Sequence, residues 1–304
     1  MAGRVEGHRD GHGFLVPDGG APPIYLPAAE MRQVLHGDRA AVRVTGVDSR
    51  GRPSGEIAQV LERANRRIVG RLHREHGVLY LVPEDRRMPL DVLIPPNEAG
   101  RAKAGQVATV ELIAQPSKHA QPIGRIAEVL GNYTDPGMEI EIALRKFDLP
   151  HEFSRKAVAA ARAMPDEVQA ADFKGRKDLR NLPFVTIDGE TAKDFDDAVH
   201  AERAAGGRNA GFRLRVAIAD VSHYVRHGDA LDRDARERGT SVYFPRRVIP
   251  MLPEKLSNGL CSLNPGVDRL AMVCDMAVTA QGKVARYEFY PAVFRSHARM
   301  TYTQ

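Results

Sequence analysis

The sequence predicts a mainly β N-terminal half, built as two small tandem barrels, followed by a part that mixes α-helices and β-strands. Three observations predict this fold class. Five short blocks in residues 1–62 recur in residues 63–132 at an offset of 66 to 69 residues. Both copies consist of short β-branched and apolar runs separated by Gly, Pro, Asp and Asn. After residue 132 the repeat stops, and an alanine-rich stretch typical of a helix follows.

The repeat defines the first two domains, residues 1–62 and residues 63–132. A unit of this length with five short strands is typical of a Greek-key barrel of the oligonucleotide-binding (OB) kind. The nearly constant offset across five blocks makes chance a poor explanation. The paired blocks are Gly3–Val5 with Gly70–Leu72, Phe14–Pro17 with Tyr80–Pro83, Ile24–Pro27 with Val92–Pro95, Gly37–Val42 with Gly105–Val110, and Gly55–Leu61 with Gly124–Leu130.

Residues 133–180 are predicted to be a helical connector, and residues 181–304 to form the last domain. A turn-rich stretch around Gly131–Gly137 marks the boundary. We expect a helix over residues 151–171 that Ser154 caps and that ends near Pro165, with a second short helix opening at Asp166. Two apolar runs, at residues 183–187 and 212–221, are predicted strands of the last domain.

Composition limits the class of protein. The chain is 43% hydrophobic and 27% charged, which is typical of a globular chain that buries a core. No apolar run approaches the roughly 20 residues that span a bilayer, and the N-terminus lacks the apolar core of a signal peptide. Cys261 and Cys274 are too few for a disulfide framework. We therefore expect a cytoplasmic protein without membrane association, and a monomer.

Positive charge and aromatic residues suggest a surface for nucleic acid. Residues 63–132 carry 11 Lys and Arg against 7 Asp and Glu, and such a basic patch attracts phosphate backbones. Aromatic side chains on an OB barrel stack on the bases of single strands. A solvated arginine-rich linker and ordinary core aromatics remain alternatives. The candidate residues are His12, Phe14 and Tyr25 in the first copy, and His73, Tyr80 and the arginines 63, 66, 67, 71 and 74 in the second, of which Arg67, Arg71 and Arg74 are the preferred ones.

Four aspartates, Asp188, Asp194, Asp196 and Asp197, lie within ten residues directly after a predicted strand. Carboxylates held this close raise one another's pKa, and cations are what keep them ionised together. Hard divalent cations that prefer oxygen ligands are the natural partners, with Mg²⁺ as the first choice and Mn²⁺ as the alternative. The run is therefore the best candidate for the chemistry of this chain.

Several kinds of site contain acidic runs. An EF-hand needs Gly at loop position six and Glu at position twelve, and the run has neither pattern. Asp194 and Asp196 alone would suit an Asp-x-Asp sugar-nucleotide site, and a solvated acidic loop is the structural alternative. A two-metal phosphodiesterase needs several carboxylates around the scissile phosphate, and this run supplies them. Asp220 ends a predicted strand and is either a supporting carboxylate or a satisfied buried one.

The motif from Asp188 to Val199 closely resembles the signature of the ribonuclease II/ribonuclease R superfamily. Later segments are similar to further blocks of that superfamily, with the ribonuclease R branch as the nearer relative. The tandem barrels resemble the two cold-shock-type domains that precede the catalytic domain in these enzymes. The matching later segments are Val216–Val225, Gly239–Pro253 and Leu256–Pro265.

The resemblance implies a processive, magnesium-dependent 3′-to-5′ exoribonuclease that hydrolyses single-stranded RNA to nucleoside 5′-monophosphates. It implies that residues 181–304 begin an α+β catalytic domain of the ribonuclease II type. Asp188 and Asp197 match direct metal ligands, Asp196 the carboxylate whose loss most impairs hydrolysis, and Asp194 a further metal or water contact. Tyr243 matches a tyrosine that stacks on a nucleotide near the RNA 3′ end.

In the superfamily the catalytic domain is about twice as long as residues 150–304, and further domains flank it. We therefore expect this chain to be the N-terminal portion of such an enzyme, truncated within the catalytic domain. Two functional readings follow: an exoribonuclease, or a single-stranded RNA-binding module with weak or no turnover. A third reading, a structural piece that binds neither RNA nor metal, conflicts with the aspartate run.

Overall fold

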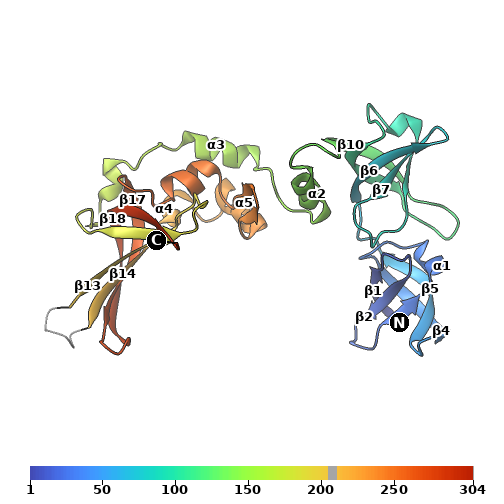
Figure 1. Cartoon of the computed structure of the whole chain (residues 1–304), viewed down its shortest axis with the longest axis horizontal. Coiled ribbons are helices and arrows are strands. Elements are labelled where there is room, and N and C mark those ends of the chain that lie inside the picture. Colours follow the sequence, from blue (N-terminus) through green and yellow to red (C-terminus); the bar gives the residue numbers. More distant parts are fainter. Residues whose placement is uncertain (205–210, 304) are drawn as a thin grey trace. The chain divides into compact units, whose positions relative to one another are not determined.

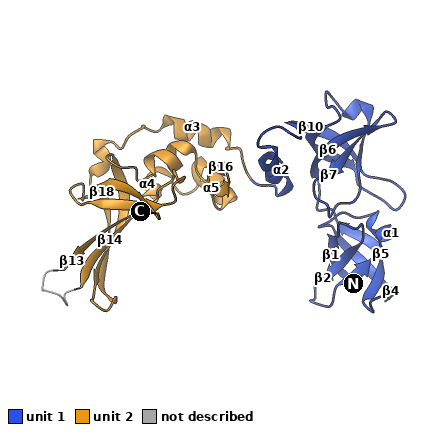
Figure 2. Ribbon diagram, viewed as in Figure 1, with its two compact units in different colours: residues 1–149 blue, residues 150–304 orange. Residues whose placement is uncertain are grey.

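The sequence repeat corresponds to two closed five-stranded barrels (Figure 1). The computed structural model describes residues 1–204 and 211–303. The chain divides into two units, Met1–Leu149 and Pro150–Gln304 (Figure 2). In the described residues no helix is long and apolar enough to cross a membrane.

Both barrels have the same strand order, with the fifth strand of each copy between its third and fourth strands. This shared topology confirms the mainly β fold class of the first half. The first barrel consists of β1 (Ala2–Gly7), β2 (Gly13–Pro17), β3 (Ile24–Leu26), α1 (Ala28–Met31), β4 (Arg39–Val47) and β5 (Pro53–Glu62). The second consists of β6 (Arg67–Glu75), β7 (Val78–Pro83), β8 (Val92–Ile94), the 3₁₀ helix η1 (Pro96–Glu98), β9 (Gln106–Ala114) and β10 (Ile123–Asn132).

The repeated positions are those that the barrels bury. Alternate residues of each strand point inward because side chains alternate along a strand. Glycine recurs where two strands cross too closely for a side chain. A Cβ atom at Gly3 would lie 2.2 Å from the Val16 carbonyl oxygen, and one at Gly70 would lie 2.1 Å from that of Val82. Equivalent buried residues are Val5, Leu15, Ile24, Leu26 and Val42 in the first barrel, and Leu72, Leu81, Val92, Ile94 and Val110 in the second.

Arg63 lies in the connection between the two barrels and has a structural role. Its guanidinium donates to the carboxylate of Asp38 (2.9 Å) and to the carbonyl oxygen of Pro116 (3.0 Å). Asp38 is fully buried and also accepts from the backbone N–H groups of Leu35 and Ala64, each at 2.9 Å. Arg63 therefore satisfies a buried carboxylate, and its part in a basic surface for nucleic acid stays a prediction.

The expected connector, residues 133–180, is divided between the two units. Its first helix, α2 (Met138–Lys146), covers the outside of the second barrel, where Met138 packs on Val69 and Val107. Sequence reasoning did not predict this helix. The expected helix over 151–171 is the shorter α3 (Arg155–Ala163). The Ser154 hydroxyl accepts from the Ala157 N–H at 3.2 Å, so Ser154 caps α3 as predicted.

Helix α3 ends where Met164 becomes extended, because the residue before a proline disfavours helical geometry. No helix opens at Asp166 in this described segment, and the expectation of one there is wrong. The next element is the 3₁₀ helix η2 (Ala170–Phe173).

The second unit is built on a six-stranded mixed sheet with the order β11-β18-β12-β13-β14-β17. The long strand β18 pairs first with β17 and later with β12, so it links both ends of the sheet. The strands are β11 (Lys177–Asp178), β12 (Phe184–Asp188), β13 (Asp197–Arg203), β14 (Phe212–Ala219), β17 (Asp268–Val278) and β18 (Val284–Thr301).

Helices and a small hairpin pack at one end of this sheet, and β13, β14, β17 and β18 extend away from them (Figure 1). Phe184, Phe195 and Phe294 are fully buried between the sheet and the helices. The remaining elements are α4 (Val221–Tyr224), α5 (Ala230–Arg238), β15 (Val242–Phe244), β16 (Arg247–Ile249) and the π-helix η3 (Lys255–Leu260).

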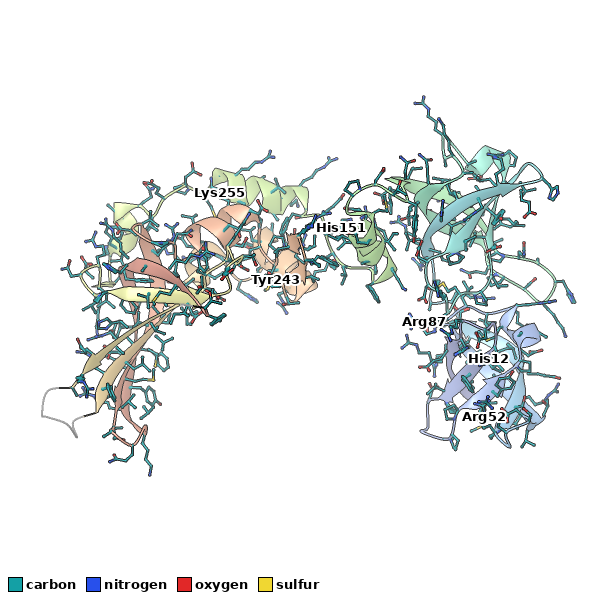
Figure 3. All side chains as sticks on the ribbon, viewed as in Figure 1. His12, Arg52, Arg87, His151, Tyr243 and Lys255 are labelled. Carbon is teal, nitrogen blue, oxygen red and sulfur yellow. The ribbon has the colours of Figure 1, made fainter. Side chains whose placement is uncertain are left out.

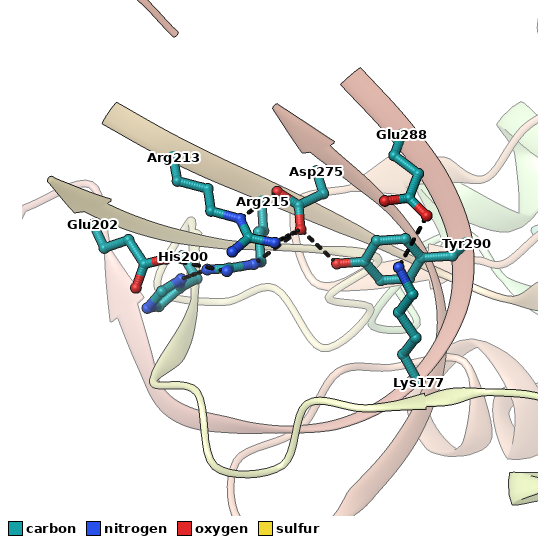
Figure 4. Close-up of polar contacts among 8 residues, drawn as sticks. All are labelled: Lys177, His200, Glu202, Arg213, Arg215, Asp275, Glu288 and Tyr290. Atoms are coloured by element: carbon teal, nitrogen blue, oxygen red, sulfur yellow. Dashed lines mark hydrogen bonds and ion pairs between the residues drawn. The ribbon is translucent and has the colours of Figure 1, made fainter. Parts of the chain in front are cut away.

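A polar network crosses the sheet of the second unit (Figure 4). Asp275 accepts two hydrogen bonds from Arg213, both 2.8 Å, one from Arg215 at 3.2 Å and one from the Tyr290 hydroxyl at 2.7 Å. Arg215 also donates to Glu202 at 3.1 Å. Arg215 and Asp275 are both buried. Each charge would therefore destabilise the folded state if the opposite charge of the other were removed.

Candidate active site and nucleic-acid interface

The four aspartates lie where two strands meet at one edge of the second unit. Asp188 is the last residue of β12, and Asp197 is the first residue of β13. Asp194 and Asp196 lie in the loop that connects these strands. The end of β18 pairs beside Asp188, and the Tyr302 N–H donates to the Asp188 carbonyl oxygen at 3.3 Å. The predicted apolar strand therefore does deliver the aspartate run to a strand end.

Phe195 anchors this loop to the core. Its side chain is 2% exposed. Its backbone N–H donates to the Ser262 hydroxyl at 3.2 Å, and its carbonyl oxygen accepts from the Leu263 N–H at 2.7 Å. While Phe195 is buried, its neighbour Asp194 is partly exposed and its neighbour Asp196 is exposed. The apolar residue in the middle of the acidic run is thus what presents the carboxylates.

Arg299, near the end of β18, holds the other side of the loop. Its guanidinium donates to the carbonyl oxygens of Glu190 (2.7 Å) and Ala192 (3.1 Å). The same guanidinium lies 4.5 Å from the centre of the Phe195 ring. The sequence analysis assigned no role at the aspartate loop to Arg299 or Ser262. Both contact the loop from more than 60 residues away, and no local pattern marks such contacts.

The carboxylates influence one another electrostatically. Burial raises the pKa of Asp188, and the charges of Asp197, Asp196 and Asp194 raise it further, against an opposing effect of Arg299. Burial also raises the pKa of Asp196, with added contributions from Asp197 and Asp194. Negative charge is therefore concentrated here beyond what the described side chains neutralise.

The donor set fits a divalent cation. The Oδ2 atom of Asp188 is buried and has no hydrogen-bond partner among the described residues. Carboxylate oxygens are the ligands that Mg²⁺ and Mn²⁺ prefer, and a cation would satisfy this atom while relieving the mutual repulsion. Within residues 1–204 and 211–303, no three of the four aspartates bring ligand oxygens within 4.8 Å of one another. The site is thus acidic and open, with carboxylates that repel one another.

Tyr243 lies on β15 and contacts Asp194, which is 49 residues earlier in the sequence. Its hydroxyl donates to the Asp194 carboxylate, and this hydrogen bond, followed by burial, raises the pKa of Tyr243 to about 12. The residue is 62% exposed, so its ring is available for stacking. Figure 3 labels Tyr243 in the second unit.

Asp220 does not belong to this cluster. It accepts from Arg176 at 2.6 Å and from the Ser222 hydroxyl at 2.7 Å. Burial acts to raise the pKa of Asp220, but these two hydrogen bonds outweigh it and lower the pKa. Of the two interpretations of Asp220, a supporting carboxylate of the aspartate site or a buried carboxylate with satisfied hydrogen bonds, the second therefore holds.

The first barrel carries a continuous aromatic surface. The rings of His12, Phe14 and Tyr25 contact one another with centroids 5.5 to 5.8 Å apart. The guanidinium of Arg52 lies 5.1 Å from the Phe14 ring centre and 5.4 Å from that of Tyr25. Figure 3 labels His12 and Arg52 on this barrel. Arg52 was not predicted, because it lies in a turn of ordinary composition between β4 and β5.

The candidate residues of the second barrel are more spread out. Tyr80 stacks on His73 with ring centroids 5.7 Å apart. Arg71 lies over the ring of Tyr133 at 4.9 Å, and Arg74 donates to the carbonyl oxygen of Gly77 at 3.0 Å. Arg67 is exposed at the start of β6. The candidate side chains therefore lie along β6 and its neighbouring strand β7.

A double substitution tests the cation site. We expect Asp196→Asn/Asp197→Asn to melt about 2–4 °C higher than wild type without divalent metal, since roughly 1 kcal/mol of repulsion removed from a domain this size has that effect. The variant should also lose the rise in melting temperature that Mg²⁺ or Mn²⁺ confers on wild type by binding the folded state. Calorimetry with and without metal measures both effects.

The control for this experiment is Glu190→Gln, which removes one negative charge from the same loop. The Glu190 side chain accepts from the Thr303 hydroxyl at 2.8 Å. This variant should keep the full metal response. An equal metal response in the aspartate double variant would exclude these carboxylates as the ligands.

Three family models match the chain in order. The Ribonuclease B OB domain matches residues 3–60, the Cold shock domain residues 80–154, and the RNB domain residues 176–304. In solved structures, the chain is similar to Mycoplasma genitalium RNase R in complex with ribose-methylated single-stranded RNA. That match has 27% identity and a TM-score of 0.87, and covers 100% of this chain and 48% of the other. The fold is also shared with yeast Ssd1, a pseudonuclease, at 17% identity and a TM-score of 0.71.

Sequence relatives cover the whole chain. Ribonuclease R of Escherichia coli (strain K12) is 50% identical over 304 residues, and the chain spans 37% of that protein's length. Ribonuclease R of Acidithiobacillus ferrooxidans is 48% identical over 306 residues, and the chain spans 69% of its length. With 48% identity to a relative of which it spans 69%, and with matches to three domain models, the chain belongs to the ribonuclease R family.

Proposed function

We propose that this protein is a 3′-to-5′ exoribonuclease that hydrolyses single-stranded RNA to nucleoside 5′-monophosphates, with Mg²⁺ bound by the four aspartates. The observation that carries the proposal is the buried Oδ2 atom of Asp188, which has no hydrogen-bond partner among the described residues and lies within a cluster of carboxylates that raise its pKa. Membership of the ribonuclease R family supports the direction and products of the reaction. We also propose that the protein acts in the cytoplasm as a monomer.

The aspartates have distinct proposed roles. Asp188 and Asp197, at the ends of adjacent strands, would hold the cation directly. When bound, the cation would polarise the scissile phosphate and favour the ionised form of the attacking water. Asp196 is exposed on the loop and lies between Asp194 and Asp197 in the sequence. Phe195, Ser262 and Arg299 position these groups by fixing the loop backbone.

Tyr243 is proposed to bind the RNA beside the carboxylates. An exposed aromatic ring stacks on any base, which suits an enzyme that degrades RNA regardless of sequence. Its hydroxyl is held by Asp194, so the ring and the cluster are fixed relative to each other. This contact would place the terminal nucleotide within reach of the cation site.

The alternative is an RNA-binding module without turnover. Fold alone does not separate the two readings, since the fold is also that of a pseudonuclease. The aromatic surface of the first barrel supports RNA binding under both readings. The charge of the aspartate cluster favours the enzyme, because a binding surface for phosphates gains nothing from four carboxylates.

The test compares residues 1–304 with a chimaera that joins them to the remaining sequence of the Escherichia coli relative. With 5′-labelled RNA and Mg²⁺, the chimaera should shorten the RNA progressively from its 3′ end and release mononucleotides. Residues 1–304 alone should bind RNA with little turnover, because catalysis depends on several preorganised groups, each worth roughly 10²–10³ in rate. Binding without hydrolysis by the chimaera would favour the alternative.

Salt dependence separates phosphate contacts from base stacking. Affinity for poly(A) and poly(U) should fall with salt at a log–log slope of about −0.7 per phosphate contacted. Arg71→Gln should make this slope shallower by about 0.7. Tyr25→Ala should weaken binding by about 1–3 kcal/mol while leaving the slope unchanged. Fluorescence anisotropy at several salt concentrations measures both quantities, and a salt-independent affinity would contradict the proposed surface.

A further inference from the structure

The loop between β1 and β2 gathers three metal-binding side chains. Residues 8–12 form this loop, and Gly7 pairs with Gly13 at its base. The His8 N–H donates to the His12 carbonyl oxygen at 2.8 Å, and the Gly11 N–H donates to the His8 carbonyl oxygen at 3.0 Å. Gly11 has a φ of +89°, which glycine adopts without strain. The backbone thus fixes the loop before any ligand binds.

This loop brings His8, Asp10 and His12 together. One ligand atom from each lies within 4.8 Å of the others, which is the one such group among the described residues. The His8 Nδ1 atom is 3.4 Å from Asp10 Oδ2. The two imidazole rings stack with centroids 4.4 Å apart at an angle of 23°. Three donors therefore already lie at a spacing that one ion can bridge after small side-chain rotations.

The chemistry of these donors differs from that of the aspartate cluster. Two imidazoles and one carboxylate suit Zn²⁺, Ni²⁺ or Co²⁺, whereas Mg²⁺ prefers oxygen ligands alone. Histidine binds metal in its neutral form. Burial, and then the neighbouring His8, lower the pKa of His12, which is the direction that favours this neutral form. The remaining coordination positions face solvent, because Asp10 is exposed and both histidines are partly exposed.

We propose that His8, Asp10 and His12 form a binding site for a divalent transition metal, with Zn²⁺ as the test ion. An exposed His–Asp ion pair is the ordinary interpretation of His8 and Asp10. The stacked second histidine and the closed loop distinguish this group from such a pair. The site lies in the first barrel and does not depend on the proposed ribonuclease activity.

The test uses untagged protein, since a histidine tag binds the same metals, and excess Mg²⁺ to occupy the aspartates. Isothermal titration with Zn²⁺ should detect one site per chain. Three single variants should each weaken binding by at least about tenfold, since even indirect perturbation of a metal site costs 10–100-fold. These variants are His8→Ala, Asp10→Asn and His12→Phe, of which the last keeps an aromatic ring against Phe14 and Tyr25.

The matched control is His76→Asn. His76 is an exposed histidine beside Glu75, at 3.9 Å, in the corresponding hairpin of the second barrel. Its φ of +48° is one that asparagine tolerates. This variant should bind Zn²⁺ as tightly as wild type.

A measurement on wild type alone guards against variants that fail to fold. In NMR spectra of the histidine rings, one equivalent of Zn²⁺ should shift the signals of His8 and His12 and leave those of His76 unchanged. Failure of wild type to bind Zn²⁺ in the presence of Mg²⁺ would overturn the proposal. So would unchanged binding in the folded His8 and His12 variants, or equal shifts at His76.

Discussion

In the chimaera with the Escherichia coli relative, Asp196→Asn should reduce RNA hydrolysis by roughly 10²–10³-fold or more, the typical cost of one preorganised electrostatic group. Asparagine has nearly the same shape, so the loop anchored by Phe195 should keep its conformation. The substitution removes charge that acts on the transition state, whereas stacking on Tyr243 and arginine contacts hold the RNA in the ground state. Affinity for single-stranded RNA should therefore remain close to that of wild type.

Single-turnover hydrolysis of 5′-labelled RNA, together with anisotropy binding in the absence of Mg²⁺, separates these two effects. Glu190→Gln is the control, because it removes one charge from the same loop without altering the four aspartates. Its hydrolysis rate should remain within about twofold of wild type, as a solvent-exposed charge outside the reacting groups contributes little. Equal losses of activity in both variants would show that net loop charge, and not Asp196, is responsible.

Asp275→Ala should destabilise the second unit by about 3–5 kcal/mol, the usual cost of leaving a buried charge without its partner. The reason is the network of Figure 4. Asp275 accepts hydrogen bonds from Arg213, Arg215 and Tyr290. Arg215 is buried and would lose its buried carboxylate partner, although Glu202 and His200 would still lie within hydrogen-bond distance. Urea denaturation followed by circular dichroism and tyrosine emission measures the change.

The effect should depend on pH. Hydrogen bonding to Arg213 is the main cause that lowers the pKa of Asp275 to about 2, below the ordinary aspartate value of about 3.9. The folded state therefore binds this proton more weakly than the unfolded state. The stabilisation is complete above pH 3.9 and disappears as the pH falls through 2. The difference between wild type and Asp275→Ala should shrink over that range.

Glu202→Gln is the matched control within the same network. Glu202 pairs with Arg215 at 3.1 Å but its side chain is 45% exposed, and exposed ion pairs contribute about 0–1 kcal/mol. A loss for Asp275→Ala no larger than that of Glu202→Gln would show that water, rather than Asp275, satisfies Arg215.

The sequence by itself determined the two barrels, because the residue pattern of each strand lies in a short stretch of sequence and occurs in both copies. Alternation along a strand requires a buried apolar residue at the equivalent positions Val5 and Leu72. A close approach of two strands requires glycine at the equivalent positions Gly3 and Gly70. The aspartate run was also visible, because all four carboxylates lie within ten residues. Family membership followed from the same contiguous motifs and agrees with the comparisons with known proteins.

Only the tertiary structure decided which residues, far apart in the sequence, contact the aspartate loop and the barrels. Arg299 and Ser262 hold the aspartate loop from 67 or more residues away. Arg63 satisfies the buried Asp38, and helix α2 forms where Met138 covers the second barrel. Buried polar groups must find partners wherever packing places them. These partners are close in space but far apart in the sequence, so a local sequence pattern does not predict them.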